Sequence, residues 1–349
     1  MNIPDGASGL FRTRITELLG IRHPILAGGL MWLSDASYVA AVVNAGCMGF
    51  MTSRSFATLS EWHTALDDCS RLTEGKSFGV NLSTSRHTAI PLMDYLHVAL
   101  EHGVRCFETA GRAPSDELIR EIKRAGAVVI HKVPLLRHAV TAERLGVDAI
   151  TIVGMECGGH PGVNTNIPAM FAAAQAVGRL HIPFSVGGGI GTGRQLLAAL
   201  AMGADAVTLG TRLVAAEEVS AHPAYKGRVV ESDETSSLVV FAGNLKMGGA
   251  WRVLDNATAR EVRRREQAGA QTYEEFKDLI AGSLVAERWY RGGETEFGLV
   301  SLGPAACFVD RVEPIAAIIE GIVAEAGEYL NHLVAMRERA YIRAGPMAG

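Results

Sequence analysis

Short apolar runs alternate with longer segments of helical periodicity along the first two thirds of the chain. A recurring pattern joins them: a helical segment, a glycine, and then a run rich in β-branched residues. Glycine ends a helix in the left-handed conformation at little steric cost, and the apolar run that follows is typical of a strand buried on both faces. The pattern occurs at residues 45–50, 102–107, 125–130, 145–151 and 202–209.

Three further apolar runs lie between these units, at residues 24–27, 77–81 and 182–186. The chain therefore has eight candidate strands between about residue 24 and residue 210. Helical periodicity separates them, for example at residues 36–44, 116–124, 136–145 and 195–202. Eight β-then-α units in one run predict an α/β fold, a (β/α)8 TIM barrel. An open doubly wound sheet is the structural alternative, because periodicity alone does not distinguish the two.

The pattern changes after Thr211. Residues 220–291 are more charged and mostly helical in periodicity, and a final amphipathic stretch covers residues 313–339. We therefore predict a barrel formed by residues 11–219 and 300–345. Residues 220–299 are predicted to form an α-helical subdomain on the substrate side, over the C-terminal face of the barrel.

Composition narrows the class of protein. The 349 residues carry a net charge of −4 without basic clustering, which argues against a nucleic-acid partner. The five cysteines are scattered and include no C-x-x-C pair, which favours a reducing compartment over a disulfide framework or a zinc site. We find no signal peptide and no apolar run of membrane-spanning length. We expect a cytoplasmic enzyme without a bound metal, and leave a homodimer open.

Glycine-rich turns follow the last two predicted strands. Gly187-Gly188-Gly189 comes directly after the seventh strand, and Gly210-Thr211 comes after the eighth. Glycines let backbone N–H groups approach an anion closely, and these two loops of a barrel commonly hold a phosphate. Each could also be a simple tight turn. A dinucleotide-binding Rossmann site is disfavoured, because the sequence does not match G-x-G-x-x-G and no acidic residue closes the next strand.

A histidine stands among glycines after the sixth strand, in the stretch from Gly154 to Gly162. His160 is a candidate acid or base because histidine titrates near neutrality; alternatively, it only holds the loop by hydrogen bonds. Cys157 lies nearby. A metal site would need further ligands, and a nucleophilic cysteine would need a lowered pKa.

Other polar residues end neighbouring strands. Lys132 ends the fifth strand, where an unpaired buried ammonium group would be costly. It could point into the barrel mouth and neutralise an anion or an electron-rich ring, or it could extend to the surface. Asn81 and Ser83 offer hydrogen bonds after the third strand, and Gly28-Gly29 would let a flat ring lie against the backbone.

Together these motifs resemble the nitronate monooxygenase family, formerly called 2-nitropropane dioxygenases, whose members are FMN-dependent barrels. The resemblance extends over nearly the whole chain. Its most specific parts are Gly28-Gly29, residues 78–82, His131-Lys132, residues 156–162, Gly187-Gly188-Gly189 and Gly210-Thr211.

The resemblance implies FMN as the cofactor and a role for each motif. The residues that would bind it are Gly28, Gly29, Leu30, Asn81, Ser83, Lys132, Gly158, Gly159, Gly187, Gly188, Gly189, Gly210 and Thr211. Lys132 would stabilise negative charge on the flavin, and the two glycine turns with Thr211 would hold the phosphate. His160 would be the active-site histidine.

The leading hypothesis is therefore oxidation of alkyl nitronates by dioxygen, which yields a carbonyl compound and nitrite, with His160 and Lys132 as the catalytic residues. A branch of the same family uses NAD(P)H and a quinone, so an NAD(P)H:quinone or enoyl-thioester reductase is the first alternative. The second is a barrel that binds a phosphate ligand without flavin. An activity like that of IMP dehydrogenase would need a nucleophilic cysteine, for which Cys157 is the candidate.

Overall fold

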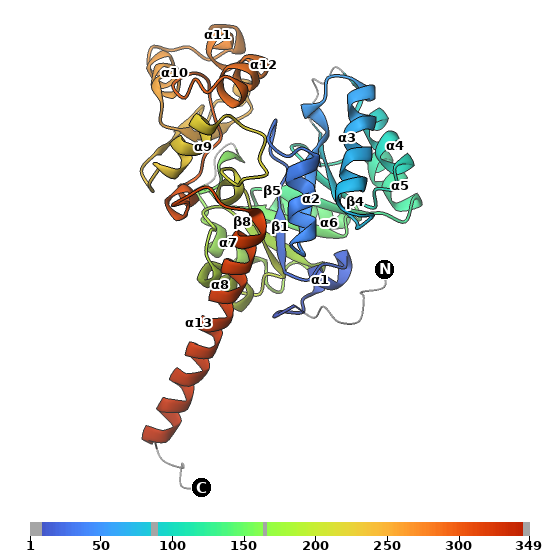
Figure 1. Ribbon diagram of the computed structural model, residues 1–349, viewed down its shortest axis with the longest axis vertical. Helices are drawn as coiled ribbons and strands as arrows, with labels where there is room; N and C mark the ends of the chain where they lie inside the picture. Colours follow the sequence, from blue (N-terminus) through green and yellow to red (C-terminus); the bar gives the residue numbers. More distant parts are fainter. Residues whose placement is uncertain (1–8, 85–89, 163–165, 345–349) are drawn as a thin grey trace.

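A closed barrel of eight parallel strands forms the centre of the molecule. The computed structural model describes residues 9–84, 90–162 and 166–344. Neighbouring strands follow chain order around the barrel, and β9 pairs with β1 to close it (Figure 1). The predicted TIM barrel is thus confirmed. Its strands are β1 (Ile25–Ala27), β2 (Met48–Thr52), β3 (Gly79–Ser83), β4 (Cys106–Ala110), β5 (Val128–Val133), β6 (Ala149–Val153), β8 (Phe184–Gly187) and β9 (Ala206–Leu209).

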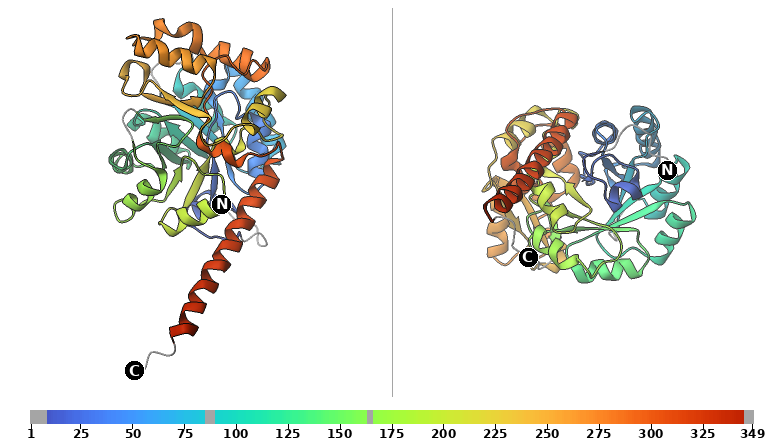
Figure 2. Two further views of the ribbon diagram at one scale, coloured as in Figure 1. Left: turned by 90° about the vertical axis from the view of Figure 1, so that its left-hand side faces the viewer. Right: turned by 90° about the horizontal axis from the view of Figure 1, so that it is seen from below.

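Helices on the outside of the barrel connect these strands (Figure 2). They are α2 (Ala36–Asn44), α3 (Leu59–Leu72), α4 (Leu92–Glu101), α5 (Asp116–Arg124), α6 (Leu136–Arg144), α7 (Ala169–Ala176) and α8 (Gly193–Ala201). Helix α3 begins at a capping box, in which the Thr58 side chain and the Glu61 side chain each bind the other's backbone N–H. The predicted bounds of α2 and α5 agree with the structure because caps and glycines mark both ends in the sequence.

One end of the barrel interior is filled with apolar side chains. Leu26, Phe50 and Ile130 form a buried cluster with Ile15 and Leu19 of helix α1 (Arg14–Leu19). Helix α1 therefore closes the N-terminal end of the barrel, where the strands begin. This apolar plug contributes to stability and leaves the other end for chemistry.

The opposite half of the interior is polar. The hydroxyl groups of Thr151, Ser185 and Thr208 form a buried chain with oxygen–oxygen distances of 2.8 and 3.0 Å. Asn81 and Glu108 are buried in the same half. Because side chains alternate along a strand, Glu108 points to the same side of β4 as the apolar Cys106, two residues earlier.

Residues 220–299, predicted to form a helical subdomain, include strands as well as the expected helices. Its helices are α9 (Pro223–Val230), α10 (Ala257–Gln267), α11 (Lys277–Ile280) and α12 (Gly282–Val285), with a π-helical turn at Ala286–Arg291. Figure 1 shows α10 to α12 on the side of the barrel away from α1. Strands β10 (Ser237–Val240) and β11 (Ala250–Leu254) form an antiparallel sheet with β7 (Gly159–Gly162), in the order β10-β11-β7.

The long helix α13 (Ile315–Ala344) ends the described chain. Its first turns bury Ile315, Ile319 and Ile322 against the barrel, next to α8. Its later part extends away from the rest of the molecule (Figures 1 and 2), and Leu333 is half exposed there. Residue 345, the last of the predicted barrel range, lies outside the described residues. Within the described ranges no helix is both long enough and apolar enough to cross a membrane.

A pair of glycine substitutions tests the packing of the barrel. A Cβ atom at Gly79 would overlap a Phe50 ring carbon, whereas a Cβ at Gly227 in α9 would meet no atom within 4 Å. We expect Gly79→Ala to lower the free energy of unfolding by about 1–3 kcal/mol through overpacking. Gly227→Ala should raise it by about 0.5–1 kcal/mol, because alanine favours a helix. Urea unfolding measures both, and equal effects would contradict the packing described.

Candidate active site at the barrel mouth

Two glycines after β1 leave no side chain between their loop and the barrel interior. A Cβ atom at Gly28 would lie 3.4 Å from the Thr208 methyl carbon and 3.6 Å from the Lys132 ammonium nitrogen. A Cβ at Gly29 would lie only 2.6 Å from Asn81 Cβ. The backbone of this loop is therefore in close contact with the polar half of the barrel, and it presents a surface without side chains.

A buried carboxylate lies beneath this loop. Glu108 on β4 is 1% exposed, and its two oxygens accept hydrogen bonds from Lys132 Nζ at 3.0 and 3.1 Å. Asn81 Nδ2 donates a short hydrogen bond to the same carboxylate, and the Gly29 N–H group lies 3.5 Å from it. The structure thus brings together three of the predicted residues around a fourth that sequence reasoning missed. A glutamate in the apolar strand Cys106–Ala110 was the available signal, as Lys132 was in β5.

The two glycine turns occupy the ends of β8 and β9, as expected for a phosphate-binding site. Gly188 and Gly189 have φ angles of +121° and +66°, which residues with a side chain rarely adopt. Their N–H groups donate to no acceptor among the described residues. Thr211 begins a 3₁₀ turn, so its N–H group also has no partner within that turn. These N–H groups remain available for an anion.

Two other predicted residues border the same mouth. Leu30 extends toward the second glycine turn, with its Cδ2 atom 3.9 Å from the position that a Cβ at Gly210 would take. Ser83 ends β3, is half-buried and accepts a long hydrogen bond, 3.5 Å, from Arg54. Gly187, the first glycine of the turn after β8, packs its backbone against Thr208.

The segment before His160 packs on Thr211 in the turn after β9 and on Gly303. A Cβ atom at Gly158 would lie 2.8 Å from the Gly303 nitrogen and 3.1 Å from Thr211 Oγ1. The Gly303 N–H group in turn donates to Thr211 Oγ1 at 2.9 Å. Gly159 has a φ angle of +92° and begins β7. This close packing fixes the position of the strand that follows.

His160 lies on strand β7, where the sequence suggested a loop. Its imidazole stacks on the indole of Trp251 in β11, with ring centroids 4.8 Å apart and 24° between the planes. The Trp251 N–H group donates to Ser301 Oγ at 2.9 Å, which fixes the indole. Trp251 is a residue that sequence reasoning missed, since its contact with His160 depends on pairing between distant strands.

His160 is exposed overall, while the Trp251 indole covers one face of its imidazole. Desolvation on the covered side lowers the pKa of His160 to about 4. The pKa falls because burial disfavours the charged imidazolium form. At neutral pH the ring is therefore uncharged, and one of its nitrogens has a free lone pair that can accept a proton.

Cys157 lies beside this site without the properties of a nucleophile. Burial raises the pKa of its thiol to about 12, so the thiolate is scarce at neutral pH. No group of three or more His, Cys, Asp or Glu side chains among the described residues is arranged to hold a metal ion. The described contacts thus offer no support for the cysteine and metal alternatives.

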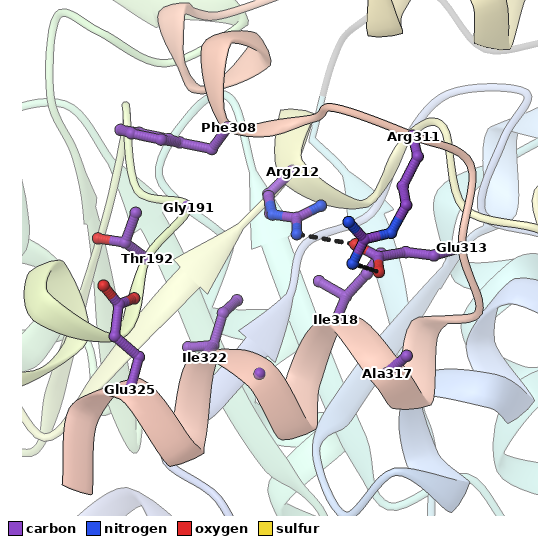
Figure 3. Close-up of a pocket in the computed structure, with 11 residues that line it drawn as sticks. Gly191, Thr192, Arg212, Phe308, Arg311, Glu313, Ala317, Ile318, Ile322 and Glu325 are labelled. Carbon is purple, nitrogen blue, oxygen red and sulfur yellow. Dashed lines mark hydrogen bonds and ion pairs between the residues drawn. The ribbon is translucent and has the colours of Figure 1, made fainter. Parts of the chain in front are cut away.

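A cavity of about 250 Å³ lies next to the two glycine turns, outside the barrel mouth (Figure 3). It is lined by the residues that follow each turn, among them Thr192 and Arg212, and by α13. Glu313 binds Arg212 at 3.0 Å and Arg311 at 2.9 Å beside it. None of the predicted cofactor-binding residues lines this cavity, so it is separate from the Gly28-Gly29 loop and the Glu108 contacts described above.

The environment of His160 leads to a pH prediction. We expect the His160 imidazole to titrate near pH 4, and a Trp251→Leu variant to titrate closer to the usual value of about 6.5, because water gains access to the ring. Since the folded pKa lies below the unfolded value, this group destabilises the fold as pH falls from about 6.5 to 4. NMR of ¹³C-labelled histidine measures the titration. A wild-type value near 6.5 would refute the desolvated ring.

Thiol labelling tests the assignment of Cys157. Iodoacetamide at pH 8 should modify the exposed Cys307 in the native protein and leave Cys157 unmodified, because the pKa of Cys157 is about 12. Mass spectrometry of tryptic peptides identifies the labelled positions. Urea-unfolded protein is the control in which all five cysteines should react. Rapid native labelling of Cys157 would restore it as a candidate nucleophile.

Comparison with known proteins places this site in context. The chain is similar to a (3aS,4S,5R,7aS)-5-hydroxy-7a-methyl-1-oxo-octahydro-1H-indene-4-carboxyl-CoA dehydrogenase of Mycobacterium tuberculosis, with 29% identity over 94% of this chain and 99% of that protein. It is also similar to a probable nitronate monooxygenase of Staphylococcus aureus, with 28% identity over 68% of this chain and 78% of that protein.

Solved structures show the same barrel. FabK from Thermotoga maritima superposes with a TM-score of 0.84 and 33% sequence identity, covering 93% of this chain and 99% of FabK. A nitroalkane oxidase from Streptomyces ansochromogenes shares the fold, with a TM-score of 0.78, 23% identity and coverage of 92% of this chain and 100% of that one. The family model for nitronate monooxygenase matches residues 12–325, and the chain therefore belongs to the nitronate monooxygenase family of oxidoreductases.

Proposed function

We propose that this protein is an FMN-dependent oxidoreductase that acts on an acyl-CoA thioester, exchanging hydrogen at the carbon atoms next to the thioester carbonyl. The extent of the similarity to CoA-thioester dehydrogenases carries this choice. Such enzymes from Mycobacterium tuberculosis and Rhodococcus jostii are 29% identical to this chain over 94% and 93% of its length, and the matches span 99% of each of them. The relative from Staphylococcus aureus matches 68% of this chain.

The residues at the barrel mouth fit FMN. The N–H groups of Gly188, Gly189 and Thr211 lack acceptors among the described residues and would hold the phosphate. The loop at Gly28 and Gly29 offers a backbone surface without side chains, on which a flat ring could lie. Bound FMN would supply the acceptor or donor of an electron pair.

His160 would move the proton in either direction of the reaction. The carbon next to a thioester carbonyl is a weak acid, and an uncharged imidazole has the lone pair that removes its proton. A pKa of about 4 keeps His160 uncharged across the neutral range, which suits proton removal in the oxidation direction. In the reverse direction the ring would have to take up a proton before it could return one to that carbon. Stacking on Trp251 would orient the ring plane.

Lys132 would stabilise negative charge that develops at the ring end. Its ammonium nitrogen lies 3.6 Å from the position of a Cβ at Gly28, so it reaches the surface under that loop. A preorganised cation in a site shielded from water stabilises developing charge more strongly than solvent does.

Oxidation of an alkyl nitronate by dioxygen is the second candidate, and the family match over residues 12–325 favours it. A nitronate is already deprotonated at carbon, so it has no need of a base. Dioxygen would be the second substrate there, whereas NAD(P)H or a quinone would exchange electrons with the thioester enzyme. Both reactions use the same cofactor site.

Parallel assays separate the two candidates. We expect kcat/KM for a cyclic or branched acyl-CoA with an artificial electron acceptor, or for an enoyl-CoA with NAD(P)H, to exceed that for propyl nitronate with dioxygen by at least about tenfold, equivalent to 1.4 kcal/mol. Free FMN under the same conditions is the control. A higher kcat/KM for propyl nitronate with dioxygen than for any of the thioesters would contradict the thioester proposal.

A His160→Asn variant tests the proton-transfer role. Asparagine is polar but does not accept a proton near neutral pH, so thioester turnover should fall by about 10²–10⁴-fold. Turnover of a pre-formed nitronate should fall far less, since it needs no proton removal. His138→Asn, on the exposed side of α6, is the matched control and should leave both rates near wild type. Equal losses for both substrates in the His160 variant would argue against His160 as the base.

A further inference from the structure

We propose that Glu108 is a positioning residue for the cofactor ring, because its carboxylate fixes Lys132, Asn81 and the Gly29 loop and offsets the charge of Lys132. This inference rests on the proposed function, in which a flavin ring occupies the space under Gly28 and Gly29. It concerns a residue that contacts neither phosphate turn nor His160 in the described structure.

Three groups from different parts of the chain contact the Glu108 carboxylate. Glu108 lies on β4, between Asn81 on β3 and Lys132 on β5, and it pairs directly with Asn81 in the strand register. Donors from three separate parts of the chain reach it: the Lys132 ammonium group, the Asn81 amide and the Gly29 backbone N–H. Because each of these groups also borders the mouth, the carboxylate sets their positions relative to one another.

Because Glu108 and Lys132 are largely removed from water, each needs the other as a partner. The side chain of Glu108 is 1% exposed and that of Lys132 is 20% exposed. A carboxylate removed from water without partners would be strongly disfavoured, as would the ammonium group alone. Removal of one member of a buried ion pair leaves the other uncompensated, which costs more than the pair contributes. Glu108 and Lys132 therefore serve as each other's partner in this buried space.

The pair reaches the surface on which the ring would lie. A Cβ at Gly28 would lie 3.6 Å from Lys132 Nζ and 3.9 Å from Glu108 Oε1, so both charges lie just below this loop. A ring there would be close to a nearly neutral ion pair instead of an isolated cation. The effect of Lys132 on an electron-rich ring is thus reduced by Glu108, and the redox poise of the cofactor depends on both residues.

Substitution of Glu108 provides the test. In the FMN-loaded enzyme we expect Glu108→Gln to shift the cofactor's reduction potential to a more positive value, because the positive charge of Lys132 is no longer offset. Lys132→Gln should shift it to a more negative value. FMN should bind Glu108→Gln about tenfold more weakly, since the groups at the ring end lose a charge-assisted hydrogen-bond acceptor. Glu108→Asp keeps the charge and should restore the potential toward wild type, even if it folds less stably.

Glu313→Gln is the matched control. Glu313 is also a buried glutamate in an ion pair, with Arg212 and Arg311, but it lies outside the barrel mouth. Its substitution should lower stability and leave the reduction potential unchanged. If the potential of Glu108→Gln equals that of wild type or of Glu313→Gln, or shifts to more negative values, the proposal is overturned.

A cofactor-free measurement separates this proposal from the assignment of FMN. Urea unfolding of the apoprotein is compared for Glu108→Gln, Lys132→Gln and the double variant. The double variant should be more stable than the sum of the single losses predicts, because no uncompensated charge remains. Additive losses would refute the proposed coupling. Failure of the wild-type apoprotein to take up FMN would instead defeat the cofactor assignment, and this cycle would still decide whether Glu108 and Lys132 act as a unit.

Discussion

The two-residue period of a β-strand is the constraint on which this site depends. Side chains that point into a parallel barrel recur at every second position, and all strands end at the same rim. Apolar residues such as Phe50 and Ile130 therefore fill one half of the interior, while later residues of the same strands form the mouth. Gly28, Asn81 and Lys132 meet there although they are far apart in sequence.

The same arrangement removes polar groups from water, which is unfavourable unless they find hydrogen-bond partners. Polar groups that reach the mouth lie in a largely buried space, so each needs a partner. The hydroxyl chain of Thr151, Ser185 and Thr208 meets this need on one side of the barrel, and the Glu108 cluster meets it on the other. The mouth is thus lined by groups whose orientations are set before any ligand arrives, which is the condition for electrostatic stabilisation.

Much of the barrel could be predicted because its signals are local. The glycine at the end of each helix, the apolar strand after it and the caps of helices such as 36–44 all lie within a few residues of one another. Glu108 was missed although it has the same local signal as Lys132: a charged residue near the end of an apolar strand. Opposite charges near the ends of two neighbouring strands, Glu108 and Lys132, together predict an ion pair. Strands β10 and β11 were missed for a different reason, since Arg252 pairs with Gly159 and no local pattern reveals that distant partner.

Strand β7 has a further consequence for how this fold can diversify. His160 is joined by strand pairing and ring stacking to residues 250–254, and Gly158 before it packs on Thr211 at the end of β9. Its position therefore depends on both parts of the chain. The contacts of Glu108 with Asn81 and Lys132 lie within the barrel strands alone. Residues 250–254 are thus a place where the fold can vary the surroundings of His160 while that cluster stays intact.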